Sequence, residues 1–347
     1  MRKVSGSKVL HTLRKARTFV GATGQRIRSR STRQVRKQLA AGVDSASSAP
    51  VFFIVGQQKS GTTWLMRMLD AHPEILCKGE GRFFGAGWRQ ENIKESNDLR
   101  PASSLYNALL DSEYLRVWVD RSIWSRHENA DEHLDNLTRL AVDYFLKNEL
   151  VKTGKKMVGD KSPLLSPDTI KEISRIYPEA KVIHIIRDGR DAAVSALHHS
   201  RNFGSGNPAP KQTGESRFSK NQLRKLAADW RDRVGRTVEE GPTLLGENYR
   251  EVRYEDLLER PEAELRLLIE FLGAAVYPEI LSRCVAATSF EKLSRGRERG
   301  QEDATSFFRK GVAGDWRNTF TDQDRETFKQ EAGELLVKLG YEEDDGW

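Results

Sequence analysis

Residues 51–64 read VFFIVGQQKSGTTW: five apolar residues, a short loop, and the start of a second apolar stretch. The β-branched and aromatic side chains at 51–55 predict a strand. From Gly61 onward, apolar residues recur at the spacing of a helix face: Leu65, Met66, Met68 and Leu69. The stretch therefore predicts a strand that passes through a glycine-containing loop directly into a helix.

The loop of this unit has the composition of an anion site. The first turn of a helix presents unpaired backbone N–H groups and the positive end of the helix dipole. Lys59 adds a cation, and Gly61 lets the backbone approach a ligand. The loop departs from the GxxxxGK[ST] phosphate loop, because only two residues separate Gly56 from Lys59. Gly-Ser-Thr loops also occur as plain helix caps, but the whole string favours phosphate binding, with hydroxyl donors at Ser60, Thr62 and Thr63.

The rest of the chain alternates strand and helix patterns. Residues 181–186 (KVIHII) are typical of a strand buried on both faces. The alternation predicts one α/β domain with a central parallel sheet flanked by helices, similar to P-loop NTPases. Residues 204–219, rich in Gly, Pro and Ser, predict a long loop of the kind that often forms a functional lid. Further strands are expected at 157–158 and 251–254, and helices at 103–118, 131–151, 167–176, from 191, 220–238 and 261–272.

Charge divides the chain into two parts. Its 347 residues carry a net charge of +7, and residues 1–50 hold a single acidic residue, Asp44, among many Lys and Arg. We expect residues 1–48 to form a basic flexible extension that could contact an anionic surface or nucleic acid, and residues 49–347 to form the domain. No apolar run approaches the roughly 18 residues of a membrane span. The extension lacks the apolar core of a signal peptide, so a cytoplasmic protein is expected, with a transit peptide as the alternative.

A second strand–turn–helix unit, residues 181–195, carries a further candidate phosphate ligand. Arg187 follows the buried strand, where open α/β sheets place their ligands, and its planar fork suits a phosphate. Ser195 comes about two helical turns later. Arg187 could instead form an ion pair with Asp188 or Asp191. Residues 308–316 (FRKGVAGDW) add a compact loop of basic residues and glycines.

These motifs together resemble those of the PAPS-dependent sulfotransferases, which use 3′-phosphoadenosine-5′-phosphosulfate. GQQKSGTTW resembles the family's 5′-phosphosulfate loop, and RDGRDAAVS resembles its 3′-phosphate motif, with Arg187 and Ser195. FFRKGVAGDWRNTFT resembles the loop that closes over the same phosphate, with Arg309, Lys310 and Gly311. By the same resemblance Trp64, Tyr254, Thr288 and Phe290 lie at the adenine and nucleotide.

The resemblance implies transfer of a sulfuryl group from PAPS to a hydroxyl or amine of an unidentified acceptor, with release of PAP. The acceptor would be a small molecule, a glycan or a lipid. No metal is expected: the seven histidines form no HExxH motif, and His198 and His199 suggest a pair on a helix surface. Cys77 and Cys284 do not form a CxxC motif and are expected to be reduced.

The sequence departs from the family's pattern in two places that bear on the catalytic residues. The Lys-Thr-His segment of the phenol-type members is missing, whereas residues 159–163 (GDKSP) resemble the Lys-Ser/Thr-Pro segment of the heparan-type members. Residues 78–84 (KGEGRFF) resemble the segment in which those members carry a glutamate base, although Arg82 departs from its usual pattern. We therefore expect Glu80 to be the base, Lys161 to lie beside the transferred group and Lys59 to neutralise the leaving phosphate.

Two other classes of protein remain open. A P-loop-type nucleotide kinase or NTPase would need Walker spacing and an acidic residue for Mg²⁺, for which Asp188 is the nearest candidate. A nucleic-acid-binding module would use the basic extension.

Overall fold

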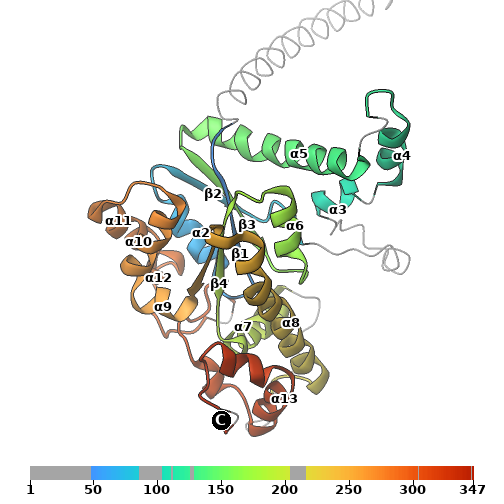
Figure 1. The fold of residues 1–347 in the computed structure, drawn as a ribbon. Coiled ribbons are helices and arrows are strands. Elements are labelled where there is room, and N and C mark those ends of the chain that lie inside the picture. Colours follow the sequence, from blue (N-terminus) through green and yellow to red (C-terminus); the bar gives the residue numbers. More distant parts are fainter. Residues whose placement is uncertain are drawn as a thin grey trace, which may run out of the picture.

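The computed structural model describes residues 48–85, 104–110, 112–125, 129–203, 216–303, 305–344 and 346–347. Within these ranges the chain forms a five-stranded sheet, in the order β2-β3-β1-β4-β5, with parallel pairing throughout. Helices flank the sheet (Figure 1). The predicted α/β architecture with a central parallel sheet is thereby confirmed. The strands are β1 (Val51–Gly56), β2 (Ile75–Gly79), β3 (Met157–Pro163), β4 (Lys181–Ile186) and β5 (Tyr249–Arg253).

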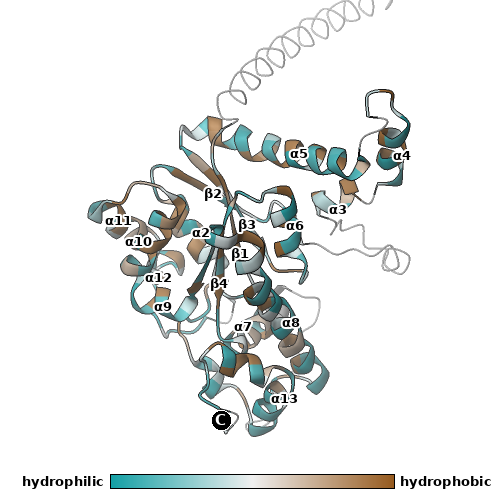
Figure 2. Cartoon of the chain, viewed as in Figure 1, coloured by the Kyte–Doolittle hydropathy of each residue, from teal (hydrophilic) through white to brown (hydrophobic). Residues whose placement is uncertain are grey.

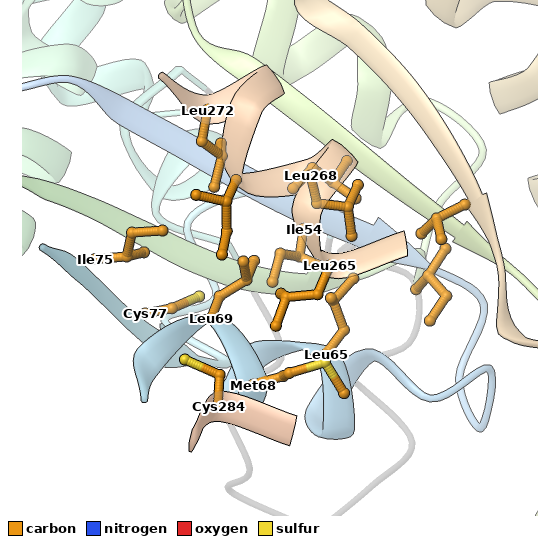
Figure 3. Close-up of a cluster of buried hydrophobic side chains, with 14 of the residues drawn as sticks. Ile54, Leu65, Met68, Leu69, Ile75, Cys77, Leu265, Leu268, Leu272 and Cys284 are labelled. Atoms are coloured by element: carbon orange, nitrogen blue, oxygen red, sulfur yellow. The ribbon is translucent and has the colours of Figure 1, made fainter. Parts of the chain in front are cut away.

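Alternate side chains of the central strands enter two separate cores, as the period of a strand requires. Phe52 and Ile54 of β1 lie in one core with Ile183 of β4. This core is covered by helices that include α2 (Thr62–Asp70), α10 (Pro261–Leu272) and α11 (Pro278–Ala287). Figure 3 shows Leu65, Met68 and Leu69 of α2 meeting Leu265 and Leu268 of α10 over β1. The short helices α9 (Tyr254–Glu259) and α12 (Phe290–Leu293) lie on the same side (Figure 1).

The opposite face of the sheet carries Phe53 and Val55, which pack with α5 (Ala130–Thr153) and α6 (Thr169–Ile176). The central strand β1 is therefore buried on both faces, and its apolar residues are brown in Figure 2, whereas much of the outer surface of the helices is teal. Beyond α5 lie α3 (Leu105–Leu110) and α4 (Glu113–Arg121).

A third cluster joins the end of β4 to the C-terminal part of the chain. Here α7 (Gly189–Phe203), α8 (Lys220–Leu245) and α13 (Asp322–Lys338) pack around Trp230, Trp316 and Phe328. This cluster matters for the site, because it fixes the loop after residue 305 against the start of α7.

Several predicted boundaries differ from the observed ones. The helix expected at 103–118 is two helices, because Ser112 adopts an extended conformation and caps α4 by accepting a hydrogen bond from Leu115 N. The helix expected at 220–238 continues to Leu245 despite Pro242, and Gly241 leaves room there for the ring of Tyr249. The short strand expected at 157–158 extends to Pro163 and so includes Asp160 and Lys161.

Parts of two predictions lie outside the described residues: most of the basic extension, 1–48, and positions 204–215 of the predicted long loop. None of the helices in the described ranges is long and apolar enough to cross a membrane. Both cysteines are buried free thiols.

Candidate functional site

The loop between β1 and α2 has the geometry of an anion cradle. Gly61 precedes α2 with a φ of 91° and offers no side-chain cap, so the first backbone N–H groups of the helix stay open to a ligand. A Cβ at Gly61 would meet the ring of Tyr254 at 2.5 Å, so both the conformation and the packing require glycine. Lys59 also has a positive φ, 73°, which is uncommon for a residue with a side chain and typical of ligand loops.

A buried hydroxyl in this loop supports an anionic ligand. Ser60 is fully buried, and its Oγ has no hydrogen-bond partner within the described part of the chain. A buried hydroxyl without a partner is costly. A phosphate or sulfate oxygen bound in the loop would supply the missing acceptor.

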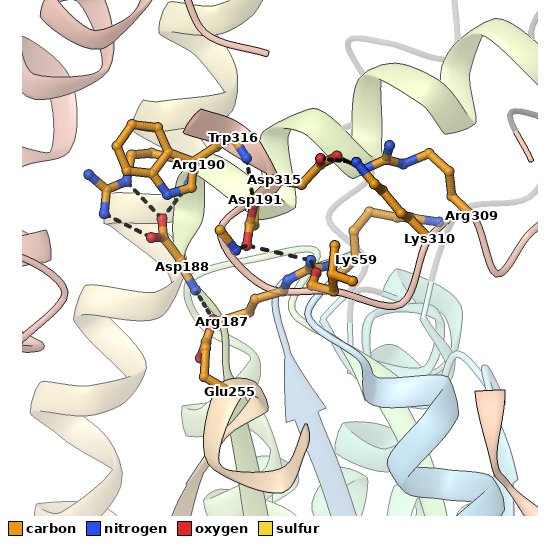
Figure 4. A network of polar contacts seen from close by, with 12 residues as sticks. Lys59, Arg187, Asp188, Arg190, Asp191, Glu255, Arg309, Lys310, Asp315 and Trp316 are labelled. Atoms are coloured by element: carbon orange, nitrogen blue, oxygen red, sulfur yellow. Dashed lines mark hydrogen bonds and ion pairs between the residues drawn. The ribbon is translucent and has the colours of Figure 1, made fainter. Parts of the chain in front are cut away.

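Arg187 links this loop to the C-terminal part of the chain. Its guanidinium donates to the carbonyl of Lys59 and to that of Val312, each over 3.1 Å, and lies 4.4 Å from the centre of the Tyr254 ring. Its Nε is buried without a partner among the described residues. Asp191 Oδ2 lies 3.7 Å from Arg187 Nη2, whereas Asp188 pairs with Arg190 (Figure 4). Arg187 is thus a buried cation with unused donor capacity at the carboxyl end of β4.

The loop at residues 305–316 is held over Arg187 by carboxylates. Asp191 accepts hydrogen bonds from Gly314 N at 2.6 Å and Trp316 N at 2.9 Å. Asp315 pairs with Arg309 and Lys310, each at 2.5 Å, and thereby orients both cations. Figure 4 shows the charged ends of both side chains turned toward Asp315, while Lys310 and Arg309 lie beside Lys59. Two basic segments far apart in sequence therefore converge at one place.

Aromatic side chains form the wall beside the cations. The indole of Trp64 donates to the carbonyl of Thr288 over 3.0 Å and meets Tyr254 edge-on at 5.7 Å. The hydroxyl of Thr288 bonds back to Cys284 O, so this residue contributes its backbone carbonyl rather than its side-chain oxygen. Phe290 packs against Gly311, where a Cβ would come within 2.3 Å of the ring.

Glu80 and Lys161 meet at the carboxyl ends of β2 and β3. Gly79 pairs with Lys161 in the sheet, and Glu80 N donates to the Lys161 carbonyl over 2.9 Å. The Lys161 ammonium, only 4% exposed, donates to Glu80 Oε1 over 2.6 Å. This hydrogen bond is the main reason why the pKa of Glu80 lies below its ordinary value. Glu80 is therefore an ionised, exposed carboxylate beside a buried cation.

Asp160 fixes the backbone around Glu80. It is 2% exposed and accepts hydrogen bonds from Gly81 N at 3.0 Å and Ser162 Oγ at 2.7 Å. Glu80 and Arg82 both adopt positive φ angles, 63° and 52°, and the Gly81 contact holds the segment between them. A conformation this uncommon persists only where the surroundings enforce it.

Most of these groups border one cleft of about 330 Å³. Of the site residues predicted from sequence, only Ser60 does not line the cleft; it is fully buried within the loop. The predicted residues that do line it are Lys59, Gly61, Thr62, Thr63, Trp64, Glu80, Lys161, Arg187, Ser195, Tyr254, Thr288, Phe290, Arg309, Lys310 and Gly311.

The cleft also contains residues that the sequence did not single out. His199 lines it from an exposed position on α7, while His198 is half-buried and lies 3.8 Å from Glu302. Ser195 and His199 are one helical turn apart, and this spacing places them on one face of α7. Phe307 and Arg299 also line the cleft. Within the described residues no group of three or more His, Cys, Asp or Glu side chains is arranged to hold a metal ion.

Lys59 is the most perturbed cation of the cleft. Burial, and then the nearby charges of Arg187 and Lys161, lower its pKa to about 8. Its ammonium lies 4.6 Å from the centre of the Phe307 ring. A lysine so placed is close to changing its charge at physiological pH.

Comparison with known proteins agrees with this geometry. Protein-tyrosine sulfotransferase A of Caenorhabditis elegans is 28% identical over 237 residues, 65% of this chain and 50% of that protein. Protein-tyrosine sulfotransferase 1 of Danio rerio is 24% identical over 262 residues, 72% of this chain and 61% of that protein. The chain thus spans about half to three fifths of the length of these relatives.

Solved structures similar to this one include mouse sulfotransferase SULT7A1 complexed with PAP, at 19% identity and a TM-score of 0.47, covering 83% of this chain and 84% of that one. Sulfotransferase STF9 from Mycobacterium avium, at 15% identity, has the same TM-score and covers 87% of this chain and 81% of that one. The sequence profile of the sulfotransferase family matches residues 50–279, more than half of the chain. The chain therefore belongs to the sulfotransferase family.

Proposed function

We propose that this protein transfers a sulfuryl group from PAPS to a hydroxyl or amine of an acceptor and releases PAP. The observation that carries the proposal is the convergence of two cationic sites on one cleft, at the carboxyl ends of the adjacent strands β1 and β4. PAPS carries anionic groups at both its 5′ and 3′ positions, so it needs two such sites. Family membership supports the same reaction.

The donor is proposed to lie along the cleft with its phosphosulfate on the loop before α2. Lys59, Ser60 and the open N–H groups at Thr62 and Thr63 would bind the 5′ end. Arg187 and Ser195 would bind the 3′-phosphate, together with the loop residues Arg309, Lys310 and Gly311. The aromatic wall would hold the adenine, through Trp64, Tyr254, Thr288 and Phe290.

The reaction needs a base, because the acceptor loses a proton as its oxygen attacks sulfur. Glu80 is the proposed base: it is ionised and lies beside Lys161 at the edge of the sheet next to the phosphate loop. Lys161 would then neutralise the transferred group. Lys59 would neutralise the charge that grows on the bridging oxygen as the bond to sulfur breaks.

The acceptor is the least defined part of the proposal. Relatives of the chain include protein-tyrosine sulfotransferases and Sulfotransferase 1B1 of Mus musculus, 31% identical over 163 residues. A tyrosine side chain of a peptide therefore joins the small-molecule, glycan and lipid hydroxyls as a candidate. Incubation with PAPS carrying labelled sulfate and a panel of these acceptors tests the proposal. Transfer to none of them, with no PAP formed, would contradict it.

A nucleotide kinase or NTPase is the alternative reaction. The acidic residue that such an enzyme would need for Mg²⁺ is engaged here, because Asp188 accepts hydrogen bonds from Arg190 Nε and Nη2 at 3.0 and 2.8 Å. A thermal-shift experiment separates the two: PAP should raise the melting temperature, and ATP with Mg²⁺ should not. The reverse result would favour the kinase.

A further inference from the structure

The segment at residues 305–312 brings one aromatic ring against the reacting end of the cleft. Phe307 lies with its ring centre 4.6 Å from the ammonium of Lys59, and it meets the ring of His199 edge-on at 6.2 Å. Both neighbours line the cleft, as Phe307 does. Nothing in the phosphate-loop motif or in the motif around Arg187 requires a ring here.

The position of Phe307 is set by the backbone of its loop. Arg297 donates to the carbonyls of Phe308 and Arg309 at 2.6 and 2.8 Å. Backbone hydrogen bonds from Gly300 to Lys310 and from Asp303 to Arg309 close the same turn. The loop that orients the two cations therefore also fixes the ring.

The next residue provides a matched contrast. Phe308 packs against Phe307 with ring centres 5.1 Å apart, but it faces Arg67, at 5.3 Å, rather than Lys59. Phe308 also lines the cleft. The two phenylalanines thus have the same side chain and lie in the same loop, but they contact different cations.

Lys59 lies where charge grows on the bridging oxygen in the proposed reaction. Water that reached this end of the cleft could replace the acceptor: its oxygen would bond to sulfur, the bond from sulfur to the bridging oxygen would break, and PAP, sulfate and two protons would result. An apolar ring over the lysine removes hydration sites from this position, and a closed site suppresses such side reactions. The ring also attracts the ammonium through a cation–π contact.

We propose that Phe307 is a specificity-determining residue that covers Lys59 and directs the sulfuryl group to the acceptor rather than to water. This inference rests on the proposed sulfuryl transfer. It predicts that the ring controls the ratio of PAP released to sulfated product formed, which the wild-type enzyme keeps close to one.

The experiment measures both products for Phe307→Ala, Phe307→Tyr and Phe308→Ala in the full chain. Phe307→Ala should raise the release of PAP without acceptor about tenfold, and the ratio should rise measurably above that of the wild type. Phe307→Tyr, which keeps a ring over Lys59, should keep the ratio at its wild-type value. Phe308→Ala should keep it near one even if donor binding weakens. Because Phe307 is 49% exposed, its truncation should not unfold the protein, and a PAP-induced rise in melting temperature checks this. If Phe307→Ala does not fold, Phe307→Gln takes its place.

Two negative outcomes are distinguishable. A ratio that stays at one in the folded Phe307→Ala or Phe307→Gln variant would overturn the role of the ring while leaving the proposed function intact. A wild-type enzyme that neither binds PAP nor forms it from PAPS would instead overturn the proposed function. A ratio that rises equally in Phe308→Ala would show that the loop as a whole excludes water, which also overturns the assignment to Phe307.

Discussion

The carboxylate of Glu80 accepts a hydrogen bond from the ammonium of Lys161 over 2.6 Å, across the carboxyl ends of the neighbouring strands β2 and β3. The pair joins the proposed base to the cation proposed to neutralise the sulfuryl group. The pair also keeps the buried lysine neutralised when no donor is bound. A base that is ionised at neutral pH can accept a proton as soon as an acceptor binds.

Glu80→Gln tests the base directly. Glutamine keeps the shape and can still accept the hydrogen bond from Lys161, but it cannot take a proton. Turnover should therefore fall by about two orders of magnitude or more, since a positioned base contributes about 10²–10⁴ in rate. The affinity for PAP should stay near that of the wild type. A Gln variant that keeps more than about a third of wild-type turnover, when chemistry limits the rate, shows that another group is the base.

His199 is the residue to examine if Glu80→Gln remains active. Two other residues fit less well: Asp160 is buried and hydrogen-bonded to Gly81 and Ser162, and His198 lies near Glu302. His199 lines the cleft, and burial together with the charge of Lys59 lowers the pKa of its imidazole.

Arg187→Ala should mainly weaken binding of the donor and of PAP. The guanidinium is buried and would provide charged hydrogen bonds to the 3′-phosphate, so the expected loss is about 1.5–3 kcal/mol. The contacts to the carbonyls of Lys59 and Val312 would be lost as well, so both loops should loosen. Arg187→Lys serves as the control: it keeps the charge but cannot bridge two carbonyls. Titration calorimetry with PAP measures the difference, and an unchanged affinity in the Ala variant would reject the 3′-phosphate site.

The lowered pKa of Lys59, about 8, predicts an alkaline limit to activity. The side chain carries its charge below this pH and loses it above, so kcat/KM for PAPS should fall as the pH rises through about 8. This parameter is the relevant one because it reports ionisations of the free enzyme. In Lys59→Arg this alkaline fall in kcat/KM should disappear, since arginine stays protonated. If kcat/KM still falls at the same pH in Lys59→Arg, a different group is responsible for the fall.

Removal of residues 1–45 should leave the melting temperature and the PAP affinity almost unchanged, because the proposed domain starts near residue 49. Differential scanning calorimetry of the full and shortened chains measures this. A drop of many degrees would show that the segment packs on the domain and that the proposed boundary is misplaced.

Much of the fold could be predicted from sequence because its central elements have strong local signals. The strand at 181–186 and the helix at 261–272 have the predicted bounds, since continuous apolar runs and helical periodicity there agree with their burial. The strand β2 was missed: only Ile75, Leu76 and Cys77 are buried, and Lys78 and Gly79 are exposed, so it has neither length nor alternation. This missed strand is what returns the chain to the cleft and brings Glu80 to Lys161.

Two of the predicted site residues had a topological signal that the missed ones lacked. Lys59 and Arg187 follow strands, where the carboxyl edge of a parallel sheet positions them by topology. Phe307 and His199 reach the cleft through tertiary packing. For His199 a signal existed in its spacing from Ser195, one helical turn, but the adjacent His198 suggested a surface pair. For Phe307 the loop is held by Arg297, which donates to the carbonyls of Phe308 and Arg309, eleven and twelve positions later, and no local sequence pattern indicates these contacts.

Gly61→Ala should abolish PAP binding, for two separable reasons. The alanine would have to adopt a φ of 91°, and its Cβ would meet the Tyr254 ring at 2.5 Å. Gly154→Ala is the matched control, because Gly154 also has a positive φ, 69°, but its Cβ would meet no atom within 4 Å. The control should lose about 1 kcal/mol of stability from backbone strain alone and keep its PAP affinity. Gly61→Ala should displace Tyr254 and the open N–H groups before α2, so that PAP no longer raises the melting temperature. If both variants bind PAP equally well, the contact between Gly61 and Tyr254 is not needed to shape the anion site.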